Sequence, residues 1–134
     1  MAKLSFIEGI GAVYEAKLNE VGIRSTDKYL ELCGTKKGRE EIAEKTGISS
    51  KLILEWANRS DLARVKGVGS EYADLLEGAG VDTVPELANR NPVNLYQKMI
   101  EVNEEKNLVR KLPSVKQVTG WVEQAKELPR VLHY

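Results

Sequence analysis

Cysteine and histidine are almost absent from this sequence of 134 residues, which holds one of each, Cys33 and His133. A single cysteine excludes an internal disulfide framework and any zinc site built from several cysteines. A single histidine excludes metal sites that need two imidazole ligands. Net charge is also absent, because 20 basic residues balance 20 acidic ones. Proteins that coat nucleic acid by bulk charge are usually strongly basic, so this mode of binding is not expected.

Long hydrophobic runs are missing as well. No stretch approaches the length of a membrane-spanning helix, and the first residues lack the apolar core of a signal peptide. The hydrophobic share of 42% and the charged share of 30% are typical of a globular protein with a real core. No nucleophile, base or ligand set occurs at a recognisable spacing. We therefore expect a cytoplasmic protein that is not an enzyme and uses no metal, cofactor or small-molecule substrate.

An internal repeat organises the chain. Residues 7–30 align without a gap on residues 65–88, at a constant offset of 58. The identical pairs are Gly9/Gly67, Gly11/Gly69, Tyr14/Tyr72, Leu18/Leu76 and Gly22/Gly80. Because the matches fall on glycines and apolar positions, where backbone geometry is decided, they indicate a true duplication.

Each copy of the repeat predicts the same local structure. A Gly-h-Gly turn, in which h is Ile10 or Val68, precedes an amphipathic helix. Gly22 and Gly80 then fit the position just after a helix end. The N-cap of the next short helix is Ser25 or Thr26 in copy one and Thr83 in copy two, where Glu86 completes a capping box.

The remaining segments also predict helices. Between the copies we expect two or three, with a break at Gly47, a cap at Ser49 or Ser50, and a last short helix capped by Ser60 or Asp61. Two further helices, at about 92–104 and 114–128, follow the second copy. The residues after Pro129 fit either a frayed tail or an apolar segment that docks on a neighbour.

The predicted fold is a single all-α domain over residues 1–134. Its parts are a first hairpin unit at 1–33, bridging helices at 35–59, a second hairpin unit at 60–91 and C-terminal covering helices at 92–134.

The two glycine turns and the helices after them resemble the helix-hairpin-helix motif in its tandem form. The segments GIGAVYEAKLNEVGI and LARVKGVGSEYADLLEGAGVDT are also similar to an uncharacterised bacterial family of small helix-hairpin-helix proteins, domain of unknown function 4332. The motif implies that backbone amides of the turns contact phosphates of nucleic acid, DNA or RNA, without reading its sequence. The residues it implies are Gly9, Ile10, Gly11, Ala12, Gly67, Val68, Gly69 and Ser70, with added charge from Lys17, Arg64 and Lys66.

Several residues favour another function. Glu8 lies in the first turn, and Val13 and Glu71 stand where nucleic-acid-binding members commonly have a basic residue. The alternative is a protein–protein adaptor, or a self-associating module, that keeps the fold and binds no nucleic acid.

Two weaker signals accompany the repeat. Residues 39–58 fit a helix-turn-helix template, for which we favour a packing role because few side chains there could read base edges. Basic residues form two clusters, which are weaker evidence for nucleic-acid binding than the glycine turns. These residues are Lys36, Lys37, Arg39, Lys51, Arg59 and Arg64 in the first cluster, and Lys106, Arg110, Lys111 and Lys116 in the second.

Overall fold

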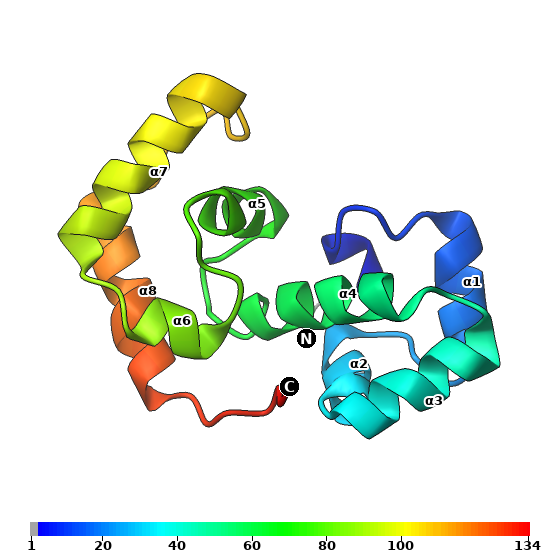
Figure 1. Cartoon of the computed structure of the whole chain (residues 1–134). Helices are drawn as coiled ribbons and strands as arrows, with labels where there is room; N and C mark the ends of the chain where they lie inside the picture. Colours follow the sequence, from blue (N-terminus) through cyan, green and yellow to red (C-terminus); the bar gives the residue numbers. More distant parts are fainter. Residues whose placement is uncertain (1–2) are drawn as a thin grey trace. The chain divides into compact units, whose positions relative to one another are not determined.

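The computed structural model describes residues 3–134, which form eight α-helices and one short 3₁₀ helix without a β-strand (Figure 1). The all-α prediction is therefore confirmed for these residues. The helices fall into two compact units. Unit 1 contains the described residues as far as Arg64 together with Arg130–Tyr134, and unit 2 contains Val65–Pro129.

Unit 1 begins with the 3₁₀ helix η1. Its elements are η1 (Leu4–Phe6), α1 (Ala12–Glu20), α2 (Thr26–Cys33), α3 (Lys36–Thr46) and α4 (Ser50–Leu62). Helix α2 packs against α3 and α4, and α3 packs against α4. Leu18, Ile23, Tyr29 and Ile53 are fully buried among these helices. Removal of their apolar surface from water is the main force that holds the unit together.

The C-terminal residues complete the core of unit 1. Leu132 is only 3% exposed and belongs to the buried cluster of this unit. The His133 amide donates a hydrogen bond of 2.7 Å to the carbonyl of Gly34. The alternative of a frayed tail is therefore wrong. The alternative of an apolar segment that docks is confirmed, and the surface on which Leu132 docks is unit 1 of its own chain.

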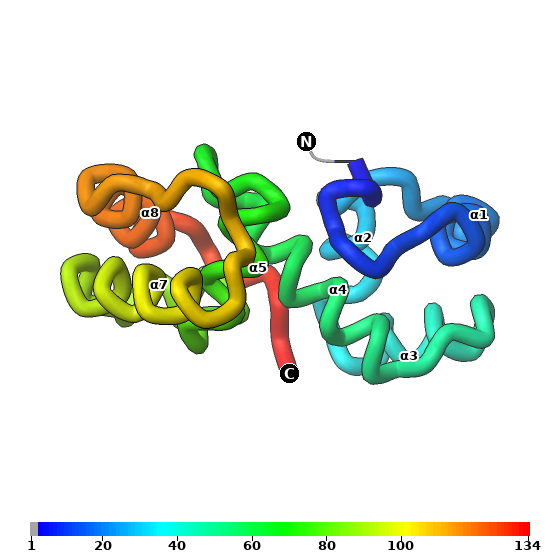
Figure 2. The backbone as a smooth tube through the Cα atoms, turned by 90° about the horizontal axis from the view of Figure 1, so that it is seen from above, coloured from blue at the N-terminus to red at the C-terminus, as the bar shows by residue number. Residues whose placement is uncertain are grey.

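Unit 2 repeats the order of four helices. Its elements are α5 (Ser70–Gly78), α6 (Val84–Ala88), α7 (Pro92–Lys106) and α8 (Val115–Glu127). Helix α8 packs against α6 and α7, and α7 packs against α5. Figure 2 shows α7 and α8 running side by side. Leu75, Leu76, Leu95 and Met99 are fully buried in this unit.

Most of the predicted helix ends are confirmed. Ser25 is the N-cap of α2 and accepts from the Lys28 amide, and Ser49 caps α4. Gly22 and Gly80 follow the ends of α1 and α5 with φ of 88° and 92°. This left-handed backbone suits glycine because it has no Cβ atom.

Two predicted features of the helix ends are wrong, a separate short helix capped by Ser60 or Asp61 and the capping box at Thr83. Helix α4 continues through Ser60 and Asp61, both fully buried. Asp61 Oδ1 lies 2.8 Å from Arg64 Nη1, so this carboxylate holds an arginine. Thr83 is the N-cap of α6, as predicted, but its hydroxyl donates to the Glu86 carboxylate and accepts no hydrogen bond from a backbone amide. The expected capping box is therefore absent there.

The duplication extends beyond the segment that the sequence aligns. The Tyr14 ring packs on Trp56 of α4 with ring centroids 5.1 Å apart, and Tyr72 packs on Trp121 of α8 at 5.2 Å. The two tryptophans are 65 positions apart, against 58 for the turns, because α7 and the segment after it are longer than their counterparts in unit 1. Each unit thus has its own turn, tyrosine and tryptophan.

Candidate functional site

The two Gly-h-Gly turns have the same backbone conformation. Gly9 and Gly67 have φ of 100° and 93°, in the region that glycine favours. Gly11 and Gly69 both have extended backbone, with φ of −87° and −85°. Ile10 and Val68 are buried, whereas the glycines on either side are exposed. The central apolar residue therefore anchors each turn and leaves its backbone at the surface.

Each turn leads directly into a helix. Gly11 is the N-cap of α1 and Gly69 is the N-cap of α5, and neither has a side chain that could bond to the helix amides. The first amides of a helix have no partner within the helix itself, and they lie at the positive end of its dipole. Ala12 and Ser70 are the first helical residues. The sequence-predicted contact residues of each copy are thus contiguous in space.

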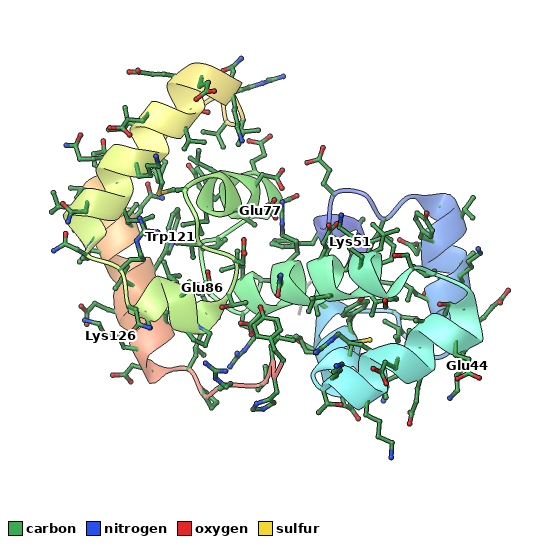
Figure 3. The ribbon with its side chains drawn as sticks, viewed as in Figure 1. Glu44, Lys51, Glu77, Glu86, Trp121 and Lys126 are labelled. Atoms are coloured by element: carbon green, nitrogen blue, oxygen red, sulfur yellow. The ribbon has the colours of Figure 1, made fainter. Side chains whose placement is uncertain are left out.

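Helix α8 contacts the second turn and the helix after it through two of its side chains, Trp121 and Gln124. Trp121 extends from α8 toward α5 (Figure 3). One turn further on, the Gln124 side chain accepts from the Lys66 amide at 2.9 Å and donates to the Lys66 carbonyl at 3.0 Å. This pair of bonds fixes the backbone of the residue that precedes Gly67.

The second turn also borders a cavity of about 450 Å³. Its lining comes from the turn, the start of α5 and the segment after α7, namely Gly67, Gly69, Ser70, Glu71, Tyr72, Arg110 and Lys111. The Tyr72 hydroxyl donates to the Lys111 carbonyl at 3.2 Å, so the segment is tied to α5. Arg110 and Lys111 are exposed, and neither forms an ion pair within residues 3–134. Two cations therefore stand beside the free end of a helix.

The basic residues chosen from the sequence behave differently from one another. Lys66 is exposed and lies at the second turn. Lys17 lies in the last turn of α1, at the opposite end of that helix from Gly11. The Arg64 guanidinium is held by Asp61, and its side chain is only 13% exposed. The structure therefore does not place Lys17 beside a glycine turn, and it leaves Arg64 engaged in an ion pair.

Sequence reasoning missed Arg110 and Lys111 as site residues. The signal was present, because both belong to the second basic cluster, but nothing in the linear pattern connects residue 110 with residue 67. Gln124 gave no signal of its own. Its role depends on the packing of α8 against the start of unit 2, which only the folded chain defines.

Two buried titratable side chains, Cys33 and Tyr29, lie elsewhere, in unit 1. Burial raises the pKa of the Cys33 thiol to about 12, against an opposing effect of the Arg39 charge. Burial also raises the pKa of Tyr29, whose hydroxyl donates to the Ile53 carbonyl at 2.6 Å. Both groups are therefore neutral at physiological pH, and Cys33 is not an activated nucleophile.

Within residues 3–134, no cluster of three or more histidine, cysteine or acidic side chains could hold a metal ion. The helices of these residues include none whose length and hydrophobicity would let it span a lipid bilayer.

Of the comparisons with known proteins, one finds a match. No curated protein and no solved structure matches this chain. A family model matches residues 8–128, which is most of the chain. The protein therefore belongs to the family described as "Domain of unknown function (DUF4332)".

Proposed function

We propose that this protein is a non-catalytic module that binds the sugar–phosphate backbone of nucleic acid without sequence preference. In this proposal the two Gly-h-Gly turns form a tandem helix-hairpin-helix pair, and the second turn makes the stronger contact with phosphate. Its expected location in the cytoplasm remains a prediction.

The cavity at the second turn is the observation that carries this proposal. It combines exposed backbone at Gly67 and Gly69, the uncapped start of α5 and the side chains of Arg110 and Lys111. Backbone amides and basic side chains both attract a phosphate, and neither distinguishes one base from another. Arginine can also hold two phosphate oxygens at once.

The acidic residues limit the expected strength of binding. Glu71 lines the same cavity and repels phosphate. With a formal net charge of zero, the molecule has no net charge that would attract a polyanion from a distance. We therefore expect weak binding that depends on a few local contacts and falls steeply with added salt.

The direct test is a titration of labelled duplex DNA and duplex RNA at low and moderate salt. Gly69→Glu places a carboxylate in the second turn, where a new Cβ atom meets nothing within 4 Å. Gly11→Glu is the matched variant in the first turn, where the space is equally open. We expect Gly69→Glu to abolish binding and Gly11→Glu to weaken it less.

A second pair of variants tests the basic residues. Arg110→Glu removes a cation from the cavity and is expected to lower affinity and the slope of its salt dependence. Lys116→Glu makes the same change of net charge outside the cavity lining. Equal effects of the two variants would argue against the cavity as the binding site.

The adaptor function remains the second candidate, and Val13 favours it. This residue is 70% exposed in the first turn of α1, where an apolar side chain gains nothing from phosphate. Absence of duplex binding at ~50 mM salt and micromolar protein, conditions in which even non-specific binders are typically detectable, would favour the adaptor. Self-association that Val13→Ser abolishes would support it directly.

A further inference from the structure

Unit 1 contains a cavity that the proposed function does not use. It measures about 510 Å³, which is within the usual range for small-molecule sites. Its lining comes from α3, the start of α4 and the last residue, namely Lys36, Arg39, Glu40, Ser50, Lys51, Leu54 and Tyr134. All of these residues belong to unit 1.

The lining carries an excess of positive charge. Lys36 and Lys51, the latter labelled near the start of α4 in Figure 3, are exposed. Neither forms an ion pair within the described residues. Glu40 is the one acidic side chain of the lining. An anion in this cavity would therefore meet two cations whose charges are not neutralised.

Arg39 adds a third cation, and this one is buried. It is 6% exposed, and its guanidinium donates to the carbonyls of Cys33 and His133 at 3.0 and 2.9 Å. Carbonyl groups satisfy two of its five N–H donors but do not balance its charge. A buried charge without an opposite charge costs free energy, which an anion in the adjacent cavity would reduce.

The cavity also offers a flat apolar surface. Tyr134 is 61% exposed, and its ring centroid lies 6.0 Å from Arg39 Cζ. Its hydroxyl donates to Asn58 Oδ1 at 2.7 Å, which fixes the ring. Leu54 is half-buried and provides further apolar lining. Exposed aromatic rings that border basic side chains are typical of sites where nucleobases stack.

We infer that this cavity binds a nucleoside phosphate. The phosphates lie toward Lys36 and Lys51, the base stacks on Tyr134 beside Leu54, and Glu40 accepts hydrogen bonds from sugar hydroxyls. The ligand is either a free nucleotide or one nucleotide of a single strand, because both present the same chemistry. This site is independent of the turn in unit 2, so either proposal can fail without the other.

The test follows backbone amide chemical shifts of the whole chain during separate titrations with ADP, inorganic phosphate and a short single-stranded oligothymidylate. ADP or the oligomer is expected to shift the amides of Lys36, Ser50 and Lys51. Shifts with ADP alone identify a free nucleotide as the source, and shifts with the oligomer alone identify a strand. Absence of these shifts with both ligands would overturn the inference.

Charge variants locate the phosphate. Lys51→Glu is expected to weaken binding about tenfold, since an exposed charge pair is replaced by repulsion. It puts an acidic residue in the first turn of α4, which helices tolerate well. Lys37→Glu is the matched control, because Lys37 is exposed on α3 and does not line the cavity. Equal weakening by both variants would mean diffuse attraction and would overturn the site.

The Tyr134→Ala variant tests stacking. It is expected to weaken ADP binding by about fivefold or more and to leave phosphate binding unchanged. Equal affinities of the parent protein for ADP and phosphate, unchanged in Tyr134→Ala, would contradict a nucleoside ligand. Arg110→Glu in unit 2 should leave all ADP shifts intact, which separates this site from the proposed duplex contact.

Discussion

Gly67 sits directly on the edge of the Trp121 indole. A Cβ atom added to Gly67 would lie 3.0 Å from Trp121 Nε1, closer than ordinary van der Waals contact. The corresponding distance from Gly9 to Trp56 Nε1 is 3.6 Å. Both glycines have positive φ, but only the second also lacks room for a side chain. The second turn is therefore the more tightly built of the two.

Gly67→Ala is expected to destabilise the protein by about 1–3 kcal/mol, for two reasons. The positive φ is unfavourable for alanine, and the alanine methyl group would contact the Trp121 indole too closely. Gly69→Ala is expected to change the free energy of unfolding by less than about 0.5 kcal/mol, because φ is negative there and the space is open. Thermal and urea unfolding of both variants measure the difference. Similar losses for the two would show that Trp121 does not restrict the turn.

Gln124→Met removes both hydrogen bonds to the Lys66 backbone while keeping the length of the side chain. We expect a loss of stability of about 1–2 kcal/mol, at roughly 0.5–1.5 kcal/mol per bond. Duplex affinity should fall with an unchanged salt slope, because no charge has been removed. Gln97→Met on the exposed face of α7 is the control. Parent-like affinity in Gln124→Met would mean that the turn needs no support from α8.

Gly34→Ala tests the docking of the C-terminal residues. A Cβ atom there would lie 2.5 Å from the Val131 carbonyl oxygen and 2.6 Å from that of Leu30. Because both are backbone atoms, we expect destabilisation of about 1–3 kcal/mol. Hydrogen exchange of the His133 amide, which bonds to Gly34, should become faster. Unchanged exchange would contradict the close approach of these two segments, and Gly11→Ala serves as the control.

The buried thiol of Cys33 predicts a loss of stability at alkaline pH. Its pKa is raised from 9.0 to about 12 by burial, so the folded protein keeps the proton that the unfolded chain releases. The contribution of this thiol to the free energy of unfolding is therefore fully present below about pH 9, and it is lost as the pH rises from 9 toward 12. Tyr29 changes stability in the same direction, since burial also raises its pKa. Urea unfolding at several alkaline pH values measures how the free energy of unfolding changes with pH, and Cys33→Ala serves for comparison. A free energy of unfolding that stays constant over this range would contradict the prediction.

Thiol labelling gives an independent check of the same group. Alkylation of Cys33 should be slow in the folded protein and fast in urea, because the thiol is both buried and protonated at neutral pH. Rapid labelling under native conditions would show that the α2 region opens readily.

The local sequence determined most of the secondary structure. Gly22, Gly47 and Ser49 each impose a backbone conformation or offer a hydrogen bond to their immediate neighbours, so their roles are visible in the linear pattern. The same holds for the two turns, whose glycines predicted the matching conformations. Ser60 and Asp61 were predicted to cap a helix because serine and aspartate are common N-caps. In the folded chain both residues are buried inside α4, so neither caps a helix.

Tertiary structure alone decided which distant residues meet. Arg110 and Lys111 lie beside the second turn because α7 is long and the segment after it returns to Tyr72. Leu132 enters the core of unit 1, although Arg64 and Arg130 are separated by the whole of unit 2. Such contacts depend on the direction and packing of entire helices, which no short sequence window contains. The sequence therefore determined the turns and the helices, and the fold decided which charged side chains lie beside them.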